Sequence, residues 1–140
     1  MPPAPGIHVH TCLVPIRWGD MDAYRHVNNA VYFSYMEQAC AEFISSLGFR
    51  ALSAAGPVVV NSACSFLRPL TYPGMAEVNM FCASPGNSSF LAFYEVRLQG
   101  EDSLYARGQM KMVWVDRATG KSTPLPDEIR ARLSLPSLLS

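Results

Sequence analysis

A cluster of polar, reactive side chains lies within ten residues, at Asp20, Asp22, His26, Asn28 and Asn29. A short loop before a helix start carries backbone N–H groups without acceptors, and the helix dipole adds partial positive charge there. Such groups can stabilise a developing oxyanion, and a carboxylate beside them can activate water or attack a carbonyl carbon. The cluster therefore indicates a minimal acyl-transfer site.

The same residues also have a purely structural interpretation. Aspartate favours turns, so Asp20 and Asp22 can be turn residues, and an asparagine can serve only as a helix cap. His26 can be a hydrogen-bonded structural histidine. Spacing alone does not choose between the structural and the catalytic interpretation.

Other reactive motifs are absent from the sequence. It has no G-x-S-x-G nucleophile elbow, no phosphate-binding loop and no dinucleotide fingerprint. His8 and His10 are expected to share one face of an extended segment, where a plain edge strand is favoured over a metal pair. Reduced, buried thiols are expected, without disulfide or zinc spacing, at Cys12, Cys40, Cys64 and Cys82.

A long helix just after the cluster is the element that positions it. Asn28 or Asn29 is the expected N-cap, and Gly48 is expected to end the helix. Apolar residues recur between them at steps of three and four, at Tyr32, Met36, Ala39, Cys40, Phe43 and Leu47. This wide apolar face implies that other elements wrap the helix.

Extended segments flank the helix. One precedes it, and four β-branched or alternating segments follow it; the five are His8–Arg17, Pro57–Leu70, Met75–Ser84, Ser88–Gln99 and Leu104–Asp116. Glycine-containing turns separate the last four, the first of them at Tyr72–Gly74. Such short connections predict antiparallel neighbours, and the whole pattern predicts an α+β domain whose sheet curls over the helix.

The length of 140 residues favours one domain over residues 1–140. A short disordered N-terminus is expected, and after about residue 121 a tail or a short helix at Asp127–Leu133. Charged residues are 16 %, against a usual share of about 25 %. A surface with so little charge favours self-association.

The balance of charge and hydropathy narrows the class of partner and the location. The formal net charge is zero, which disfavours non-specific nucleic-acid binding. No segment approaches the roughly 20 apolar residues of a membrane span, and the N-terminal residues lack the basic and apolar regions of a signal peptide. We therefore expect a cytoplasmic protein without membrane or nucleic-acid partners.

The run Arg17–Glu37 resembles the signature of the hotdog-fold acyl-CoA thioesterases of the 4-hydroxybenzoyl-CoA thioesterase type. That signature reads roughly D-x-D-x-x-G-H-V-N-N-x-x-Y-x-x-Y-x-E, and it is matched at Asp20, Asp22, His26, Val27, Asn28, Asn29, Tyr32, Tyr35 and Glu37. Weaker matches downstream extend the resemblance over about residues 11 to 130. One residue departs from it, because Arg25 stands where the family usually has glycine.

The resemblance implies a hotdog fold that hydrolyses an acyl-CoA thioester to a free acid and CoA, without a cofactor or metal. It implies a homodimer, or a dimer of dimers, with active sites at the interface. The catalytic role falls on Asp22, as general base or nucleophile, and backbone amides at the helix start hold the thioester oxygen. Residues expected to position the loop or the substrate are His26, Asn28, Asn29 and Tyr32, with weaker candidates at Asn61 and at Ser88 and Ser89 of the partner subunit.

Arg25 is expected to affect the loop in one of two ways. Glycine suits a backbone conformation that other residues adopt at a cost, so Arg25 either alters the loop or places a cation where a CoA phosphate can use it.

Two other functions fit the same fold. The first is a non-catalytic module that binds acyl-CoA or an acyl carrier protein, since fold does not fix function. The second, a dehydratase, is less expected, because those hotdog enzymes generally pair a catalytic histidine with an acid in a different motif. The acyl preference, the carrier and the choice between dimer and tetramer stay open.

Overall fold

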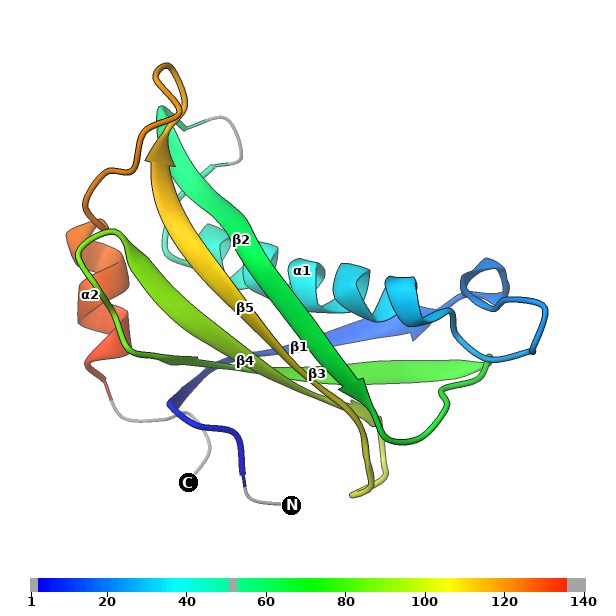
Figure 1. Cartoon of the computed structure of the whole chain (residues 1–140). Coiled ribbons are helices and arrows are strands. Elements are labelled where there is room, and N and C mark those ends of the chain that lie inside the picture. The colour runs from blue at the N-terminus through cyan, green and yellow to red at the C-terminus, as the bar shows by residue number, and fades with distance from the viewer. Residues whose placement is uncertain (1–2, 51–52, 136–140) are drawn as a thin grey trace.

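The structure is a computed structural model that describes residues 3–50 and 53–135. Five strands and two α-helices, with one short 3-10 turn, make up the described chain (Figure 1). In chain order they are β1 (Ile7–Ile16), η1 (Trp18–Asp20), α1 (Asn29–Ser46), β2 (Ala55–Phe66), β3 (Gly74–Ala83), β4 (Ser89–Leu98), β5 (Leu104–Asp116) and α2 (Asp127–Leu133).

One antiparallel sheet with the strand order β1-β3-β4-β5-β2 contains all five strands. Figure 1 shows α1 running lengthwise against the curled sheet. The predicted apolar strand faces form the core with the helix, because alternate side chains of β3, β4 and β5 are buried against α1. The α+β prediction of a curled antiparallel sheet with a long helix is therefore confirmed.

The prediction that β2 and β3 are neighbours is wrong. β2 pairs with β5 at one edge of the sheet, and β3 pairs with β1 near the other edge. The segment between them crosses the start of α1, where Leu70 is buried. Its backbone N–H donates to the Tyr32 hydroxyl (3.0 Å) and its carbonyl accepts from Val27 N (2.8 Å). The connection is thus a packed crossing held to the helix, which the turn signal at Tyr72–Gly74 does not reveal.

Both predicted ends of α1 are confirmed. Asn28 is the N-cap, and its Oδ1 accepts a hydrogen bond from Ala30 N (2.9 Å). The helix ends at Ser46, and Gly48 has a φ of 94°, a left-handed conformation that glycine adopts without a Cβ penalty.

The prediction that His8 and His10 share a face is wrong. A β-bulge lies between them, so His8 pairs with Phe81 while His10 pairs with the adjacent Met80. Neighbouring strand residues point to opposite faces, so the bulge separates the histidines. His10 Nε2 lies 2.8 Å from Glu42 Oε1 on α1.

The four cysteines of the described residues are free thiols, and all but Cys64 are buried. Residues 3–50 and 53–135 contain no helix long and apolar enough to cross a membrane. They also contain no group of three or more histidine, cysteine, aspartate or glutamate side chains placed to hold a metal ion.

Candidate active site

Asp20 is buried and fully engaged by hydrogen bonds. Its Oδ2 accepts from Arg17 N (3.0 Å) and from the Tyr35 hydroxyl (2.8 Å), and its Oδ1 accepts from the Arg17 guanidinium (3.0 and 3.2 Å). Burial alone raises the pKa of Asp20, but these hydrogen bonds outweigh it and hold the pKa below its ordinary value. Asp20 therefore fixes the turn between β1 and α1 and has no oxygen left for a substrate.

Asp22 has a different environment two residues later. It is half-buried, and its Oδ1 accepts from Tyr24 N (2.9 Å). Its Oδ2 has no hydrogen-bond partner among residues 3–50 and 53–135. The backbone is held by Asp22 N donating to His26 O (3.0 Å) and by Arg25 N donating to Asp22 O (2.9 Å). Asp22 thus presents an oriented carboxylate with one oxygen available.

Arg25 adopts a conformation that glycine would adopt without strain. Its φ is 63°, in the left-handed region, where a side chain costs roughly 1–2 kcal/mol. The hydrogen bonds around Asp22 hold this turn closed with the arginine in the strained conformation. Both expectations for Arg25, an altered loop and a cation for a CoA phosphate, stay predictions.

The first turn of α1 contains a backbone donor, the amide of Asn29, to which residues 3–50 and 53–135 supply no acceptor. Asn28 N donates to Asp20 O (2.9 Å), and the amides of Ala30 and Val31 donate to Asn28 Oδ1 and O (2.9 and 2.8 Å). The Asn29 amide lies at the positive end of the helix dipole, so it is the group best placed to bind an anionic oxygen.

Two neighbouring hollows hold these groups. Asp22 lines a hollow of about 720 Å³ together with Trp18, Met21, Ala23, Arg25, Thr71 and Tyr72. A second hollow, of about 300 Å³, is lined by His26, Val27, Asn29, Tyr32, Phe66, Leu67, Arg68 and Pro69. The hydrogen bond from Val27 N to Leu70 O joins the two segments that line both hollows. One chain therefore brings Asp22, His26 and Asn29 to the same end of α1, in adjoining hollows.

Tyr32 is almost fully buried where it lines the smaller hollow. Its hydroxyl accepts from Leu70 N (3.0 Å), and its ring packs edge-on against Phe66 with centroids 5.1 Å apart. Burial raises the pKa of Tyr32, so its hydroxyl stays protonated at neutral pH. Its contacts hold the crossing segment in place over the helix start.

Asn61, Ser88 and Ser89 are not brought to this end of the molecule. Asn61 is exposed on the edge strand β2, opposite Lys111 of β5. Ser88 O accepts from Trp114 N (2.7 Å), near the start of β2 and the far end of α1. The helix of 18 residues separates the two ends by about 27 Å. Any contribution of the serines to the Asp22 site requires a second chain.

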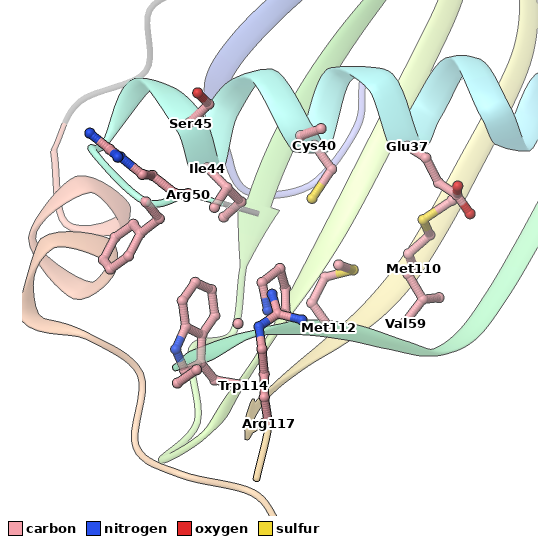
Figure 2. A pocket seen from close by; sticks show the side chains of 15 residues that line it. Glu37, Cys40, Ile44, Ser45, Arg50, Val59, Met110, Met112, Trp114 and Arg117 are labelled. Carbon is pink, nitrogen blue, oxygen red and sulfur yellow. The ribbon is translucent and has the colours of Figure 1, made fainter. Parts of the chain in front are cut away.

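A third hollow has a position and lining that the sequence could not locate. A groove of about 600 Å³ lies between the second half of α1 and the strands β5 and β2 (Figure 2). Cys40 and Ile44 line it from the helix, and Met112 and Trp114 line it from β5. The apolar periods marked Cys40, Met112 and Trp114 as inward-facing, and no sequence signal shows that the two elements diverge and leave space.

Comparison with known proteins places residues 16–133 within a family described as the thioesterase-like superfamily. A curated relative, the long-chain acyl-CoA thioesterase FadM of Escherichia coli, is 26 % identical over 123 residues, covering 86 % of this chain and 93 % of FadM.

Solved structures agree in fold over nearly the whole chain. The PA2801 protein of Pseudomonas aeruginosa has a TM-score of 0.88 and 38 % identity, covering 91 % of this chain and 99 % of that protein. A thioesterase from Thermus thermophilus, solved with coenzyme A and Zn, has a TM-score of 0.80 and 30 % identity, with coverage of 91 % and 99 %.

Proposed function

The chain belongs to the thioesterase-like superfamily, and from this premise we propose that it is a hotdog-fold thioester hydrolase acting on acyl-CoA. The reaction consumes water and releases a free carboxylic acid and CoA. The observation that supports this function is that the Asp22 carboxylate lies at the same end of α1 as the Asn29 amide, which has no acceptor in the described part of the chain.

In the proposed reaction the thioester carbonyl oxygen accepts a hydrogen bond from Asn29 N. Charge develops on that oxygen as the carbonyl carbon becomes tetrahedral, and a preorganised donor in a helix first turn stabilises it. Asp22 Oδ2 either takes a proton from the attacking water or attacks the carbon itself. Tyr24 N holds the other carboxylate oxygen, so the reactive one stays aimed.

The test of this function is thiol release from a panel of acyl-CoA substrates, followed with a thiol-reactive dye. Turnover of at least one acyl-CoA, with product acid detected by mass spectrometry, supports the proposal. Tight binding of the panel with no acid after long incubation contradicts it and favours a binding module.

Incorporation of ¹⁸O into Asp22 during a single turnover in ¹⁸O-labelled water demonstrates the nucleophilic route, whereas label in the product acid alone is also produced when water opens the anhydride at the acyl carbon. If Asp22 is the nucleophile, hydrolysis of the mixed anhydride by water at the aspartyl carbon leaves one ¹⁸O in the Asp22 carboxylate. If Asp22 is the general base, the label is confined to the product acid.

We further propose that the working unit is a homodimer joined through β2. This strand lies at the edge of the sheet, and its sequence AGPVVVNSACSF has no charged residue. Val58, Val59 and Val60 are 43, 36 and 56 % exposed. A long apolar edge without charges offers unpaired backbone groups to a second strand, and a second copy supplies an identical one. A dimer of dimers is compatible with the same interface.

This pairing would bring opposite ends of two helices together. β2 runs against α1, because Phe66 packs on Tyr32 while Gly56 and Pro57 line the groove beside Ile44. Antiparallel pairing about a two-fold axis sets the start of one β2 beside the end of the other. Ser88 and Ser89 of one chain then approach the helix start of its partner, in keeping with their expected role.

The dimer is tested with Val60→Lys, which adds a charge to the exposed edge without removing a core contact. We expect the wild type to elute and scatter light as a dimer or tetramer and the variant as a monomer with reduced turnover. A wild type that is monomeric while it hydrolyses acyl-CoA contradicts the proposal. Ser62→Lys, also exposed on β2, serves as a second probe of the same edge.

A further inference from the structure

The groove beside the second half of α1 is open at its side and lined mainly by apolar side chains, with the charged side chains of Glu37, Arg50 and Arg117 also on its lining. Figure 2 shows Cys40 and Ile44 projecting from the helix toward Met112 and Trp114 of β5. Burial raises the pKa of the Cys40 thiol to about 11, so this side chain is neutral at pH 7 and behaves as an apolar wall. A groove of this size and lining suits an apolar ligand.

The groove and the hollow at the helix start lie in line on one side of the molecule. Residues four apart stack on one helix face, so Tyr32, Met36 and Cys40 form a row along α1. Tyr32 lines the helix-start hollow and Cys40 lines the groove. Met36 is therefore the residue between the two.

On β5, which faces this row, residues beside the helix-start hollow and residues lining the groove follow one another in the same order as on α1. On the core face of β5, Ala106 pairs with Phe66 of the helix-start hollow, and Met110 lines the groove. Gly108 lies between them. The two rows thus place Met36 and Gly108 together in the packed layer between the two hollows, neither of which they line.

Met36 and Gly108 are in intimate contact. A Cβ added to Gly108 would overlap the Met36 thioether sulfur, and Met36 is fully buried. The absence of a Cβ at Gly108 lets the Met36 thioether lie against the strand. Methionine has three rotatable side-chain bonds and adapts to irregular spaces, so its thioether can swing aside where a branched side chain could not.

We propose that the groove binds the tail of a long acyl chain and that Met36 is the movable partition a chain must displace to enter it. This inference rests on the proposed function, which places the thioester at Asn29. The ligand class is an unbranched acyl group whose tail runs along α1 from Asn29 toward Ile44. Short acyl groups occupy only the helix-start hollow.

Chain lengths follow from the helix rise. Asn29 and Met36 are seven residues apart, or about 10 Å, and Asn29 and Ile44 are fifteen apart, or about 22 Å. An extended alkyl chain advances roughly 1.3 Å per carbon, given a C–C bond near 1.5 Å. Chains shorter than about eight carbons end before Met36, and the groove accommodates chains to roughly sixteen.

The experiment compares kcat/KM for hexanoyl-, decanoyl- and palmitoyl-CoA in four proteins. In the wild type we expect the ratio of palmitoyl to hexanoyl to exceed one, because each methylene bound in an apolar groove adds up to roughly fourfold. Met36→Ala removes the partition and raises that ratio about 5- to 10-fold. Cys40→Phe places a ring in the groove and lowers it at least about 10-fold.

Met75→Ala is the matched control. Met75 is half-buried at the start of β3, outside both rows, and lines neither hollow nor groove. The ratio of kcat/KM for palmitoyl-CoA to that for hexanoyl-CoA should therefore be the same in Met75→Ala as in the wild type. If Met36→Ala fails to fold, Cys40→Phe still tests the groove, because its ring grows into existing space. An unchanged length profile in a folded Cys40→Phe overturns the proposal.

Failure of the proposed function gives a different result. If the wild type hydrolyses no acyl-CoA, the thioesterase assignment is wrong, and binding then tests the groove. In a Trp18→Phe background the emission comes from Trp114, which lines the groove. A shift of the Trp114 emission that palmitoyl-CoA produces, that hexanoyl-CoA does not produce and that Cys40→Phe abolishes supports the acyl groove. An emission that palmitoyl-CoA leaves unshifted overturns it.

Discussion

The two halves of the loop before α1 hold the same kind of residue in opposite states. In the first half, Arg17–Met21, the Asp20 carboxylate is buried and takes four hydrogen bonds. In the second half, Asp22–His26, the Asp22 carboxylate is half-buried and takes one. The second half also contains Arg25, at a positive φ.

The difference shows how a short loop separates support from reactivity. A saturated carboxylate stabilises the fold and cannot react, whereas a carboxylate held by one oxygen keeps the other for chemistry. The first half therefore anchors the loop, and the second half tolerates backbone strain to present Asp22.

The largest expected effect comes from Asp22→Asn. The amide oxygen of asparagine can still accept from Tyr24 N, so the loop should keep its shape while the base or nucleophile is lost. We expect kcat to fall about 10²- to 10⁴-fold with an unchanged melting temperature. If Asp22→Asn keeps full activity on a substrate that the wild type hydrolyses well, Asp22 has no part in the mechanism, and the two aspartates do not differ in reactivity.

Asp20→Asn should act on stability. The substitution removes the charge that Arg17 and the Tyr35 hydroxyl stabilise, and it leaves a buried amide with mismatched donors. We expect the free energy of unfolding at pH 7 to fall by about 2–3 kcal/mol in urea titrations. If Asp20→Asn melts like the wild type, the first half of the loop is not the anchor.

The same variant gives a pH signature. The pKa of Asp20 is lowered in the folded state, so its contribution is complete above the unfolded pKa near 3.9. It is lost as the pH falls through the lower folded pKa. The stability gap between wild type and Asp20→Asn should therefore be constant from pH 5 to 7 and shrink below about pH 4.

Asn28→Ala tests where the loop joins the helix. The substitution removes the cap on Ala30 N and should cost about 1 kcal/mol of unfolding free energy. Asn29→Ala is the matched control, since the Asn29 side chain makes no hydrogen bond within the described chain, and its stability should change by less than about 0.5 kcal/mol. Equal losses in both variants would contradict the capping assignment.

The smallest effect is expected for Arg25→Gly. Glycine relieves the positive φ but gains freedom in the unfolded chain, so the net stabilisation should be about 0.5–1 kcal/mol. Arg25→Ala keeps the strain and removes the cation. If both variants raise KM for acyl-CoA while only glycine stabilises, the arginine is kept to bind a CoA phosphate.

Much of the fold follows from local patterns in the sequence. The cap at Asn28, the helix end near Gly48 and the bounds of β5 agree with the structure because propensity and periodicity decide them within a few residues. The sequence also indicates that Arg25 stands where the family usually has glycine. A left-handed backbone conformation is a local requirement, so the substitution is visible without the tertiary structure.

Features that depend on distant residues could not be predicted. The placement of β2 beside β5, and the bulge that separates His8 from His10, depend on pairing across the sheet. The resemblance assigned catalysis to Asp22 and left Asp20 to support the turn. The contacts that produce this difference could not be predicted, because Tyr35 reaches back fifteen residues to the Asp20 carboxylate.

The sequence by itself determined the elements, their apolar faces, the family and the loop that contains Asp22. Only the tertiary structure decided that Met36 lies on Gly108, that a groove opens beyond them, and that the Asn29 amide lacks an acceptor within the described chain. Periodicity says which side chains face inward, but the space between two inward faces depends on how far apart packing holds their backbones.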